Sequence, residues 1–287
     1  MRNFFERFER LLGTNQTPKS NPVQAVAAQA VPAPAPVVRI NPFDIGLKDA
    51  ARDGWYREAK GEVYEGFPVD AEDVVVDVGC GDGGCSLFCA NRGAHVIAVD
   101  IDAAKIAATI ERLAATPARQ VQGVVSDANP IELADGTATK VISMEVIEHV
   151  DDPAQFLSEL VRIGKPGAQY LLAVPDPASE QMQVGVAAAS YFQKPNHVRI
   201  IQRDEFEKMV TDAGLIIESH SYYSFYWSLW MLFFWICEVD LWTPEHPLLD
   251  SWTRTWSALL DSPQGDQVRK SLNLVMPKSQ VIVARKP

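Results

Sequence analysis

The sequence predicts an α/β fold in which a mostly parallel sheet carries helices on both faces. First, residues 74–100 run from a β-branched segment through a glycine-rich turn and a helix-length segment into a second apolar segment ending on Asp100. That order is typical of a strand–turn–helix–strand unit. Second, the same alternation continues as far as residue 221. Third, a chain of 287 residues, 47% of them hydrophobic, is long enough to bury the core of one such domain with additions.

The segment before residue 39 is predicted to be separate from this domain. Residues 1–12 place their apolar side chains on one helical face and their charged side chains mostly on the other, which predicts an amphipathic helix. Residues 13–38 are rich in Pro and Ala, which predicts a disordered linker. A short amphipathic helix on such a tether could dock on its own domain, on a partner or on a membrane surface.

Residues 39–287 are predicted to form the folded domain. A helical lead-in is expected over residues 39–67, where Trp55, Tyr56 and Tyr64 either close over a ligand or pack on the core. Apolar runs predict seven strands, at residues 74–78, 96–99, 121–125, 140–144, 169–174, 215–221 and 280–284. Helices are expected at residues 85–91, 103–115, 153–163 and 203–213.

A long aromatic-rich insertion, residues 222–278, separates strands six and seven. Ten of the chain's 26 aromatic residues fall within residues 222–242, so this segment is not an ordinary loop. Its uncharged run is at the lower limit for a membrane-spanning helix, and the next strand must return to the sheet, so a span is not expected. A helix packed on the domain or at a dimer interface, a lid over an apolar pocket and a membrane contact remain open. Residues 243–278 are expected to form one or two further helices.

The turn between the first two strands carries the clearest chemical signal. Its sequence, DVGCGDG at residues 77–83, combines a carboxylate with glycines that let a ligand approach the backbone closely. A GxGxxG spacing at residues 79–84 also fits a dinucleotide fingerprint, and Asp100 is placed to accept hydrogen bonds from ribose hydroxyls. However, the Asp77 carboxylate would repel a pyrophosphate, whereas it suits a ligand that carries an ammonium group.

Further motifs extend this pattern to a known family. The third strand ends on SDA around Asp127, the fourth runs into MEVIEHVDDP at residues 144–153, and NHVRIIQRDEFEKMVTDAGL covers residues 196–215. With DVGCGDG and AVDID, these motifs resemble the class I S-adenosylmethionine-dependent methyltransferases, most closely the branch that methylates small molecules, quinones and lipids. The resemblance implies a Rossmann-like seven-stranded sheet whose last strand is antiparallel.

The resemblance also implies where S-adenosylmethionine would bind. The glycine turn would hold the methionine moiety, the ends of the second and third strands would hold the ribose and adenine, and the end of the fourth would lie below the sulfonium. The matching positions are Asp77, Gly79, Cys80 and Gly81 for the methionine, Asp100 and Ile101 for the ribose and adenine, Asp127 and Ala128 for the adenine edge, and Met144 and Glu145 for the floor.

Methyl transfer to a hydroxyl calls for a base, and histidine suits this role because its ordinary pKa is near neutrality. His149 follows the fourth strand and His197 lies in the connection after the fifth, so both are candidate catalytic bases. Glu145 and Glu148 are alternative acids or bases. Purely structural or solvated roles are expected for His95, His220 and His246.

Composition limits the partners that the protein can have. The net charge of −11 argues against general nucleic-acid binding. Cys80, Cys85 and Cys89 are expected to be buried reduced thiols, and no metal is predicted, because a fourth ligand and a CxxC-type spacing are missing. No secretory signal is recognised, which predicts a cytoplasmic protein with a possible peripheral contact at the inner membrane face.

These features together predict a methyltransferase that uses S-adenosylmethionine to methylate an oxygen of a small apolar, lipid-linked or glycan acceptor. A catalytically silent partner subunit that only binds S-adenosylmethionine remains an alternative. An NAD(P)-dependent oxidoreductase is a weaker one, because no Tyr-x-x-x-Lys pair follows the fourth strand.

Overall fold

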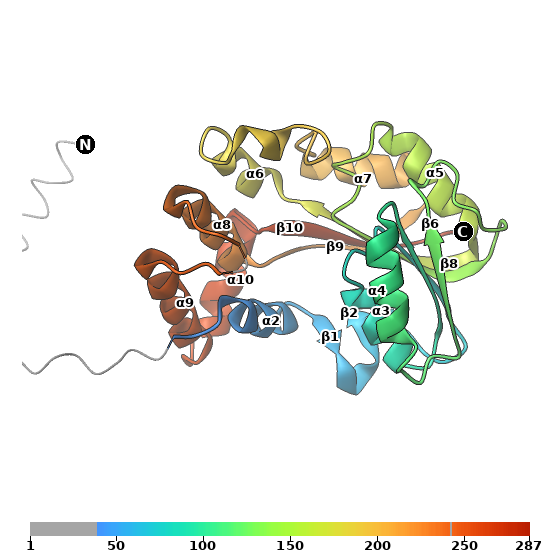
Figure 1. Cartoon of the computed structure of the whole chain (residues 1–287), viewed down its shortest axis with the longest axis horizontal. Coiled ribbons are helices and arrows are strands. Elements are labelled where there is room, and N and C mark those ends of the chain that lie inside the picture. The colour runs from blue at the N-terminus through green and yellow to red at the C-terminus, as the bar shows by residue number, and fades with distance from the viewer. Residues whose placement is uncertain (1–38, 242) are drawn as a thin grey trace, which may run out of the picture. The chain divides into compact units, whose positions relative to one another are not determined.

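A seven-stranded sheet forms the centre of the described part of the chain (Figure 1). The computed structural model describes residues 39–241 and 243–287, so the helix predicted at 1–12 and the linker predicted at 13–38 lie outside it. The strands lie in the order β6-β5-β4-β7-β8-β10-β9. Their bounds are β4 (Val74–Val78), β5 (His95–Asp100), β6 (Gln120–Val125), β7 (Ala138–Met144), β8 (Gly164–Pro175), β9 (Ile216–Tyr223) and β10 (Ser279–Arg285).

The sheet is parallel from β6 to β8, and β10 runs antiparallel to both of its neighbours, β8 and β9. This arrangement confirms the predicted Rossmann-like sheet with an antiparallel last strand. Asp77 of β4 pairs in register with Ala98 of β5 and with Ile142 of β7. The carboxyl ends of these three strands therefore meet at one edge of the sheet, where ligands bind in open α/β folds.

Helices cover both faces of the sheet because successive strand residues point to opposite sides. Val76 and Val78 pack with the helices α5 and α7, whereas Val75 packs with α3 on the other face. The four predicted helices are all present, and a short helix, α6, follows β8 without having been predicted. The helix bounds are α3 (Gly84–Asn91), α4 (Ala103–Leu113), α5 (Pro153–Ile163), α6 (Pro177–Gln183) and α7 (Arg203–Asp212).

The expectation of a helical lead-in over residues 39–67 is wrong for its second half. Only α2 (Pro42–Arg52) is a longer helix there, and a small antiparallel sheet follows it. Gly54 and Gly61 adopt positive φ angles of 101° and 67°, which end the helix and turn the chain back. Trp55 then pairs across the strands with Tyr64. The remaining bounds are β1 (Trp55–Arg57), the 3₁₀ helix η1 (Glu58–Lys60), β2 (Glu62–Tyr64) and β3 (Phe67–Pro68).

The insertion folds as three helices that pack against α2 at one end of the sheet (Figure 1). These are α8 (Phe225–Cys237), α9 (Pro247–Leu260) and α10 (Gly265–Val275); one or two further helices were expected after residue 242, and there are two. Tyr226, Trp230 and Trp256 form a separate apolar core with Ile45 of α2. Across the described ranges, none of the helices combines the length and the apolar character needed to cross a membrane.

A buried polar cluster fastens these helices to α2. The Asp53 carboxylate, directly after α2, accepts hydrogen bonds from Arg269 and from Asn273 Nδ2 (2.8 Å) on α10, and from the Ser224 backbone N–H (3.0 Å) before α8. The side chains of Asp53 and Arg269 are only 6% and 1% exposed, so the ion pair is shielded from water. We call this set of contacts the Asp53 clamp.

Candidate active site

The glycine turn between β4 and α3 needs its glycines for two reasons. Gly79 and Gly81 have φ angles of 74° and 51°, in the left-handed region that side chains disfavour. A Cβ at Gly79 would also lie 2.2 Å from Cγ2 of Val146, whereas a Cβ at Gly81 would meet no atom within 4 Å. The turn is held in place because the Gly79 and Cys80 N–H groups both donate to the Val99 carbonyl (2.8 and 3.0 Å). The backbone at Gly81 therefore borders open space.

Two carboxylates flank this turn in different environments. Asp77 is buried, and burial raises its pKa to about 6, although a hydrogen bond from Ser86 Oγ (2.6 Å) acts in the opposite direction. Asp100 accepts from the Gly81 and Asp102 N–H groups, each at 2.9 Å. These bonds aim the Asp100 carboxylate at the turn. A cationic ligand with hydroxyl groups fits such a pair better than a phosphate does.

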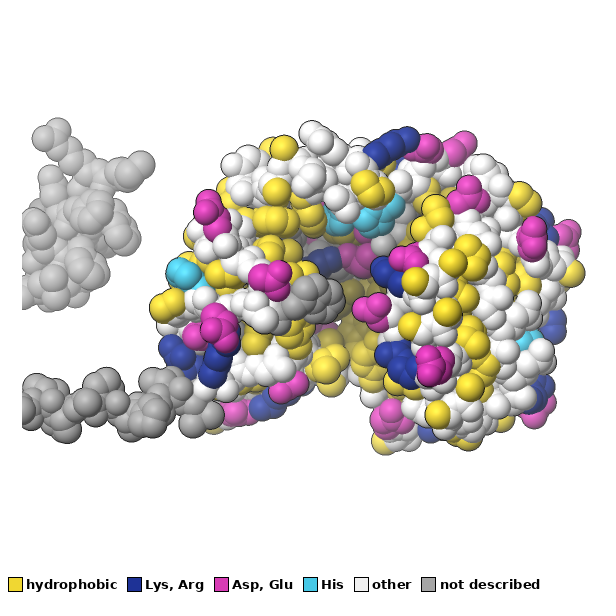
Figure 2. All heavy atoms as spheres, viewed as in Figure 1, with side chains coloured by type: hydrophobic (Ala, Val, Ile, Leu, Met, Phe, Trp, Pro, Cys, Tyr) yellow, Lys and Arg dark blue, Asp and Glu magenta, His cyan; other side chains and the backbone are white. Residues whose placement is uncertain are grey.

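The turn opens into a pocket of about 610 Å³. Six of the predicted cofactor residues line it, and the opposite wall comes from α2, the small sheet and the start of the insertion. The lining includes Phe43, Gly46, Leu47, Ala50, Trp55, Tyr56, Asp77, Gly79, Cys80, Gly81, Met144, Glu145, Tyr223, Ser224, Trp227 and Lys278. Figure 2 shows a hollow on this face, with acidic and basic side chains inside it and histidines at its rim.

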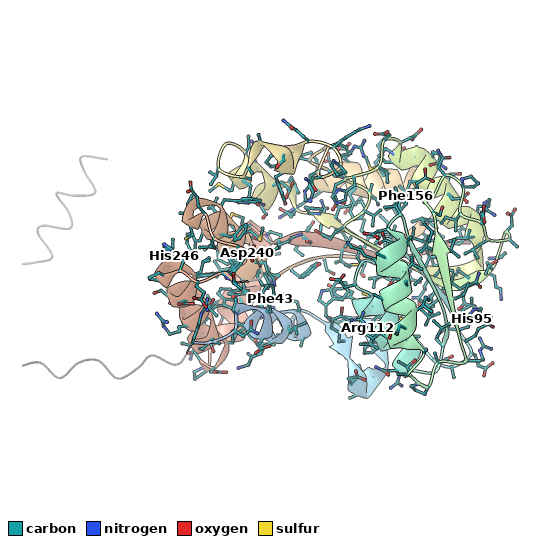
Figure 3. All side chains as sticks on the ribbon, in the orientation of Figure 1. Phe43, His95, Arg112, Phe156, Asp240 and His246 are labelled. Atoms are coloured by element: carbon teal, nitrogen blue, oxygen red, sulfur yellow. The ribbon has the colours of Figure 1, made fainter. Side chains whose placement is uncertain are left out.

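The wall opposite the turn is built from aromatic rings. Phe43, labelled in Figure 3, extends from α2, and its ring centroid lies 5.6 Å from that of Trp227 on α8. The Trp227 indole lies directly against α2 at Gly46. A Cβ at position 46 would be 2.4 Å from the ring, so the close contact depends on the glycine. The pocket therefore has a polar wall at the strand ends and an apolar wall between α2 and α8.

An ion pair closes the floor of the pocket. Lys278, just before β10, pairs with Glu145, which follows β7 with a positive φ of 55°. Burial alone would lower the pKa of Lys278, but the Glu145, Glu148 and Glu180 carboxylates raise it, so the ammonium form is favoured. Glu148 is 1% exposed, and neither of its oxygens has a hydrogen-bond partner. Burial and the Glu145 charge raise the pKa of Glu148 well above its usual range.

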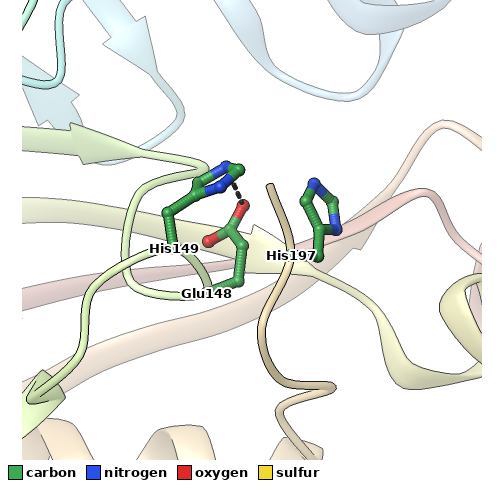
Figure 4. A group of neighbouring side chains, drawn as sticks. All are labelled: Glu148, His149 and His197. Carbon is green, nitrogen blue, oxygen red and sulfur yellow. Dashed lines mark ion pairs between the residues drawn. The ribbon is translucent and has the colours of Figure 1, made fainter. Parts of the chain in front are cut away.

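The two candidate bases lie beside Glu148 (Figure 4). His149 Nε2 is 3.7 Å from Glu148 Oε1, and the rings of His149 and His197 meet edge to face at 4.9 Å. One ligand-type atom from each of the three residues lies within 4.8 Å of the others, a spacing at which the three could hold a metal ion. Burial and the neighbouring His197 lower the pKa of His149. The sequence thus named two histidines that the fold brings into contact.

The remaining predicted site residues lie outside the pocket lining; they are Asp100, Ile101, Asp127, Ala128, His149 and His197. Asp127 is exposed at the end of β6 and accepts from the Asn129 N–H (3.0 Å), whereas Ala128 is 3% exposed. Ile101, after β5, is 73% exposed, so its side chain is free to cover a ligand. Tyr64 is buried in the core rather than at the pocket. Cys80 and Cys89 are buried, and Cys85 is half-buried against the Tyr56 hydroxyl.

Two of the three histidines expected to be structural or solvated are held in contacts of their own. His220 Nδ1 contacts Glu207 (2.7 Å), and its Nε2 contacts Gln280 (3.1 Å). His246 caps α9 by accepting from the Leu248 N–H (3.2 Å). Figure 3 shows His246 and His95 at opposite sides of the described part of the chain.

Sequence reasoning missed several residues of the site. Lys278 was included in the insertion without a role, although its position directly before the last strand could have drawn attention to it. Glu180 and Tyr191 were missed because α6 and the 3₁₀ helix η2 (Ala189–Phe192) are too short to leave a periodic pattern. The wall of α2 was missed because its contact with α8 joins residues about 180 positions apart in the chain.

Comparison with known proteins agrees with this geometry. Residues 76–172 match the methyltransferase domain family. A ubiquinone biosynthesis O-methyltransferase of Rhodopseudomonas palustris (strain BisB5) is 30% identical over 202 residues, which cover 65% of this chain and 74% of that protein. The chain belongs to the S-adenosylmethionine-dependent methyltransferase family.

Two further similarities are more limited: one covers only part of the relative, and the other is a similarity of structure at low sequence identity. A ubiquinone biosynthesis O-methyltransferase of Hahella chejuensis (strain KCTC 2396) is 33% identical over 42% of this chain, which spans half of that protein's length. The solved structure of geranyl diphosphate C-methyltransferase from Streptomyces coelicolor A3(2) has a TM-score of 0.51 at 17% identity, covering 85% of this chain and 77% of that one. The second likeness concerns the fold.

Proposed function

We propose that this protein transfers a methyl group from S-adenosylmethionine to a hydroxyl group of a small apolar acceptor. The observation that carries the proposal is a pocket that joins the glycine turn to an aromatic wall. A donor held at the strand ends and an acceptor held against the rings would share one water-poor space, which favours in-line transfer. Quinone- and tocopherol-modifying O-methyltransferases among the relatives support an apolar acceptor.

The residues of the polar wall fit the donor. Asp77 supplies negative charge near where an ammonium would lie, and Asp100 is oriented to accept from ribose hydroxyls. Glu145, whose charge is paired with Lys278, would lie below the sulfonium. The open backbone at Gly81 leaves space for the ligand. When bound, S-adenosylmethionine supplies an activated methyl group, so the protein has only to orient the acceptor, exclude water and accept the hydroxyl proton. Ile101, Asp127 and Ala128 complete the proposed adenine site.

The histidine pair is the proposed base. A neutral imidazole accepts a proton readily near neutral pH, and the lowered pKa of His149 keeps that ring neutral. His197 is more enclosed, with a side chain that is 11% exposed. Either ring would take the proton from the acceptor hydroxyl as the oxygen attacks the methyl carbon.

Calorimetric titration with S-adenosylmethionine, S-adenosylhomocysteine and NADH tests the donor half of the proposal. We expect the two sulfur compounds to bind and NADH not to bind; the reverse result would favour the oxidoreductase alternative. Turnover is then measured by mass spectrometry with 4-nonylcatechol and 4-nonylphenol as apolar hydroxyl probes. Binding of the donor with no methylated product across a wider hydroxyl panel would point to the silent partner subunit.

A further inference from the structure

His197 is held by a buried carboxylate that the sequence did not single out. His197 Nδ1 lies 2.8 Å from Oε2 of Glu180, which is 2% exposed and lies on α6. The position of Glu180 is set by the start of that helix, because the Asp176 side chain caps it and Pro177 opens it. The contact between His197 and Glu180 therefore attaches the connection after η2 to the helix α6, which directly follows β8.

The other oxygen of Glu180 is committed elsewhere. Its Oε1 accepts from the Tyr191 hydroxyl (2.9 Å) and from Gln183 Nε2 (3.4 Å). Gln183 Oε1 in turn accepts from the indole N–H of Trp235 on α8 (2.8 Å). Because these donors hold Oε1, Oε2 is left to face the imidazole. The Tyr191 ring also packs against His197, with centroids 4.4 Å apart.

This arrangement defines which nitrogen of His197 carries a proton. A carboxylate can only accept a hydrogen bond, so the facing Nδ1 must carry the hydrogen. In the neutral ring, Nε2 then keeps its lone pair, and no side chain of residues 39–241 or 243–287 hydrogen-bonds to that nitrogen in the structure. His220 provides the contrast: its Nδ1 also faces a glutamate, Glu207, but its Nε2 is engaged by Gln280.

The Glu180–His197 pair lies outside the pocket lining but is connected to the pocket floor by two observations. The Glu180 charge acts on Lys278, a residue of the pocket lining. The His197 ring meets that of His149, which follows Glu148 on the loop that begins at Glu145 of the floor (Figure 4). The groups that face His197 are thus Glu180 from α6, Tyr191 from η2, and Glu148 and His149 from the loop after β7.

We propose that His197 is the catalytic base for the acceptor and that Glu180, steadied by Tyr191, is its positioning residue. This inference rests on the proposed methyltransferase function. In the step concerned, the acceptor O–H bond breaks and its proton forms a new N–H bond at His197 Nε2. The oxygen keeps the electron pair and uses it to form a bond to the methyl carbon as the methyl–sulfur bond breaks, and the electron pair of that bond stays on sulfur. Glu180 keeps its hydrogen bond with Nδ1 and stabilises the imidazolium, which afterwards releases the proton to water.

The test compares Glu180→Gln with Glu207→Gln, which removes the same kind of charge from the other histidine–glutamate pair. With 4-nonylcatechol as the probe, Glu180→Gln should lower kcat about 100-fold, with the KM for the probe and the affinity for S-adenosylmethionine within about twofold of the parent. Glu180→Asp should recover part of the loss, and Glu207→Gln should match the parent. An unchanged kcat in Glu180→Gln, or an equal loss in both glutamine variants, overturns the proposal.

A second measurement does not depend on any acceptor. Nitrogen-15 spectra of the imidazoles should show His197 protonated at Nδ1 in the parent and as a mixture of tautomers in Glu180→Gln. A proton on Nε2 in the neutral parent ring contradicts the inference. So does activity that is lost to EDTA and restored by Zn²⁺ or Mn²⁺, because the histidine nitrogens would then serve an ion. If donor binding or turnover fails in the parent itself, the proposed function fails, while the spectra still decide the His197–Glu180 arrangement.

Discussion

The two walls of the pocket are built in opposite ways. The polar wall comes from consecutive strand ends, which the parallel register of β4 and β5 brings together. Asp77 and Gly81 line the pocket there, and Asp100 behind them accepts a hydrogen bond from the Gly81 N–H. The apolar wall comes from α2 and α8, which touch through Trp227 and are joined by the buried Asp53 clamp. The first wall depends on local backbone geometry, and the second depends on side chains from distant segments. Donor binding and acceptor selection should therefore respond to different substitutions.

The largest expected effect concerns the attachment of the insertion. Asp53→Ala leaves the Arg269 charge buried without its partner, which should lower the free energy of unfolding by about 3–5 kcal/mol. Hydrogen exchange should show α8–α10 losing protection before the sheet does. Asp266→Ala is the control, because Asp266 also contacts Arg269 but is 59% exposed. Equal losses in the two variants, or simultaneous loss of protection in both walls, would mean that the walls are one cooperative unit.

The next effect concerns the polar wall. Asp100→Ala removes the acceptor for ribose hydroxyls and for the Gly81 N–H, so affinity for S-adenosylmethionine should fall by about 1.5–3 kcal/mol. Calorimetry measures this loss. Asp82→Ala, an exposed aspartate in the same turn, should bind normally. Undiminished affinity in Asp100→Ala would rule out the ribose role.

A smaller effect should be confined to the acceptor. Gly46→Ala suits a helix, since alanine is favoured over glycine by about 1 kcal/mol, but its methyl group would displace the Trp227 ring. We expect KM for 4-nonylcatechol to rise about tenfold, a change worth about 1.4 kcal/mol, with donor affinity unchanged. The double variant Gly46→Ala, Trp227→Leu should restore space and recover much of the loss. A weaker donor affinity in the single variant would show that the walls are coupled.

The smallest effect is a pH dependence set by Asp77. Its pKa, raised by burial to about 6 from an ordinary value near 4, means that the neutral form is favoured in the fold. The contribution of Asp77 to stability is therefore present below about pH 4 and is lost as the pH rises through about 6.

Donor binding should show the opposite trend, because an ammonium group prefers the ionised carboxylate. Affinity for S-adenosylmethionine should rise about fourfold between pH 5.5 and pH 7, as the ionised fraction of Asp77 increases. Asp77→Asn should flatten this rise when affinity is measured across the same range. A rise that persists in the variant would assign the titration to another group.

The sequence predicted the polar half of the molecule far better than the apolar half. The strands and their helices follow from local hydrophobic patterns and from glycine turns, so the sheet could be placed to within a few residues. The small sheet β1–β3 escaped prediction because its strands are only two or three residues long. The sequence of α8 is apolar on all sides and so does not indicate which face meets α2 and which meets the pocket.

The candidate site was also predicted only in part: some of its residues could be named from the sequence, but their contacts could not. His149 and His197 could be named because they follow predicted strands, yet their contact and the Glu180 partner could not. Those contacts depend on the path of an irregular connection, residues 184–202, which no periodicity describes. Of the two residues that form the ion pair of the pocket floor, only Glu145 could be predicted from the sequence. Glu145 belongs to a recognisable motif, and Lys278 does not.

The position of β10 has a consequence for how the chain matures on the ribosome. This strand fills the slot between β8 and β9, although it is the last of the seven to be synthesised. Until residues 279–285 emerge, β9 has no neighbour to join it to the sheet, although α8, which follows it, can already pack against α2. The nascent protein therefore passes through a stage in which β8 and β9 each leave a strand edge unpaired, a state in which chains are prone to aggregate.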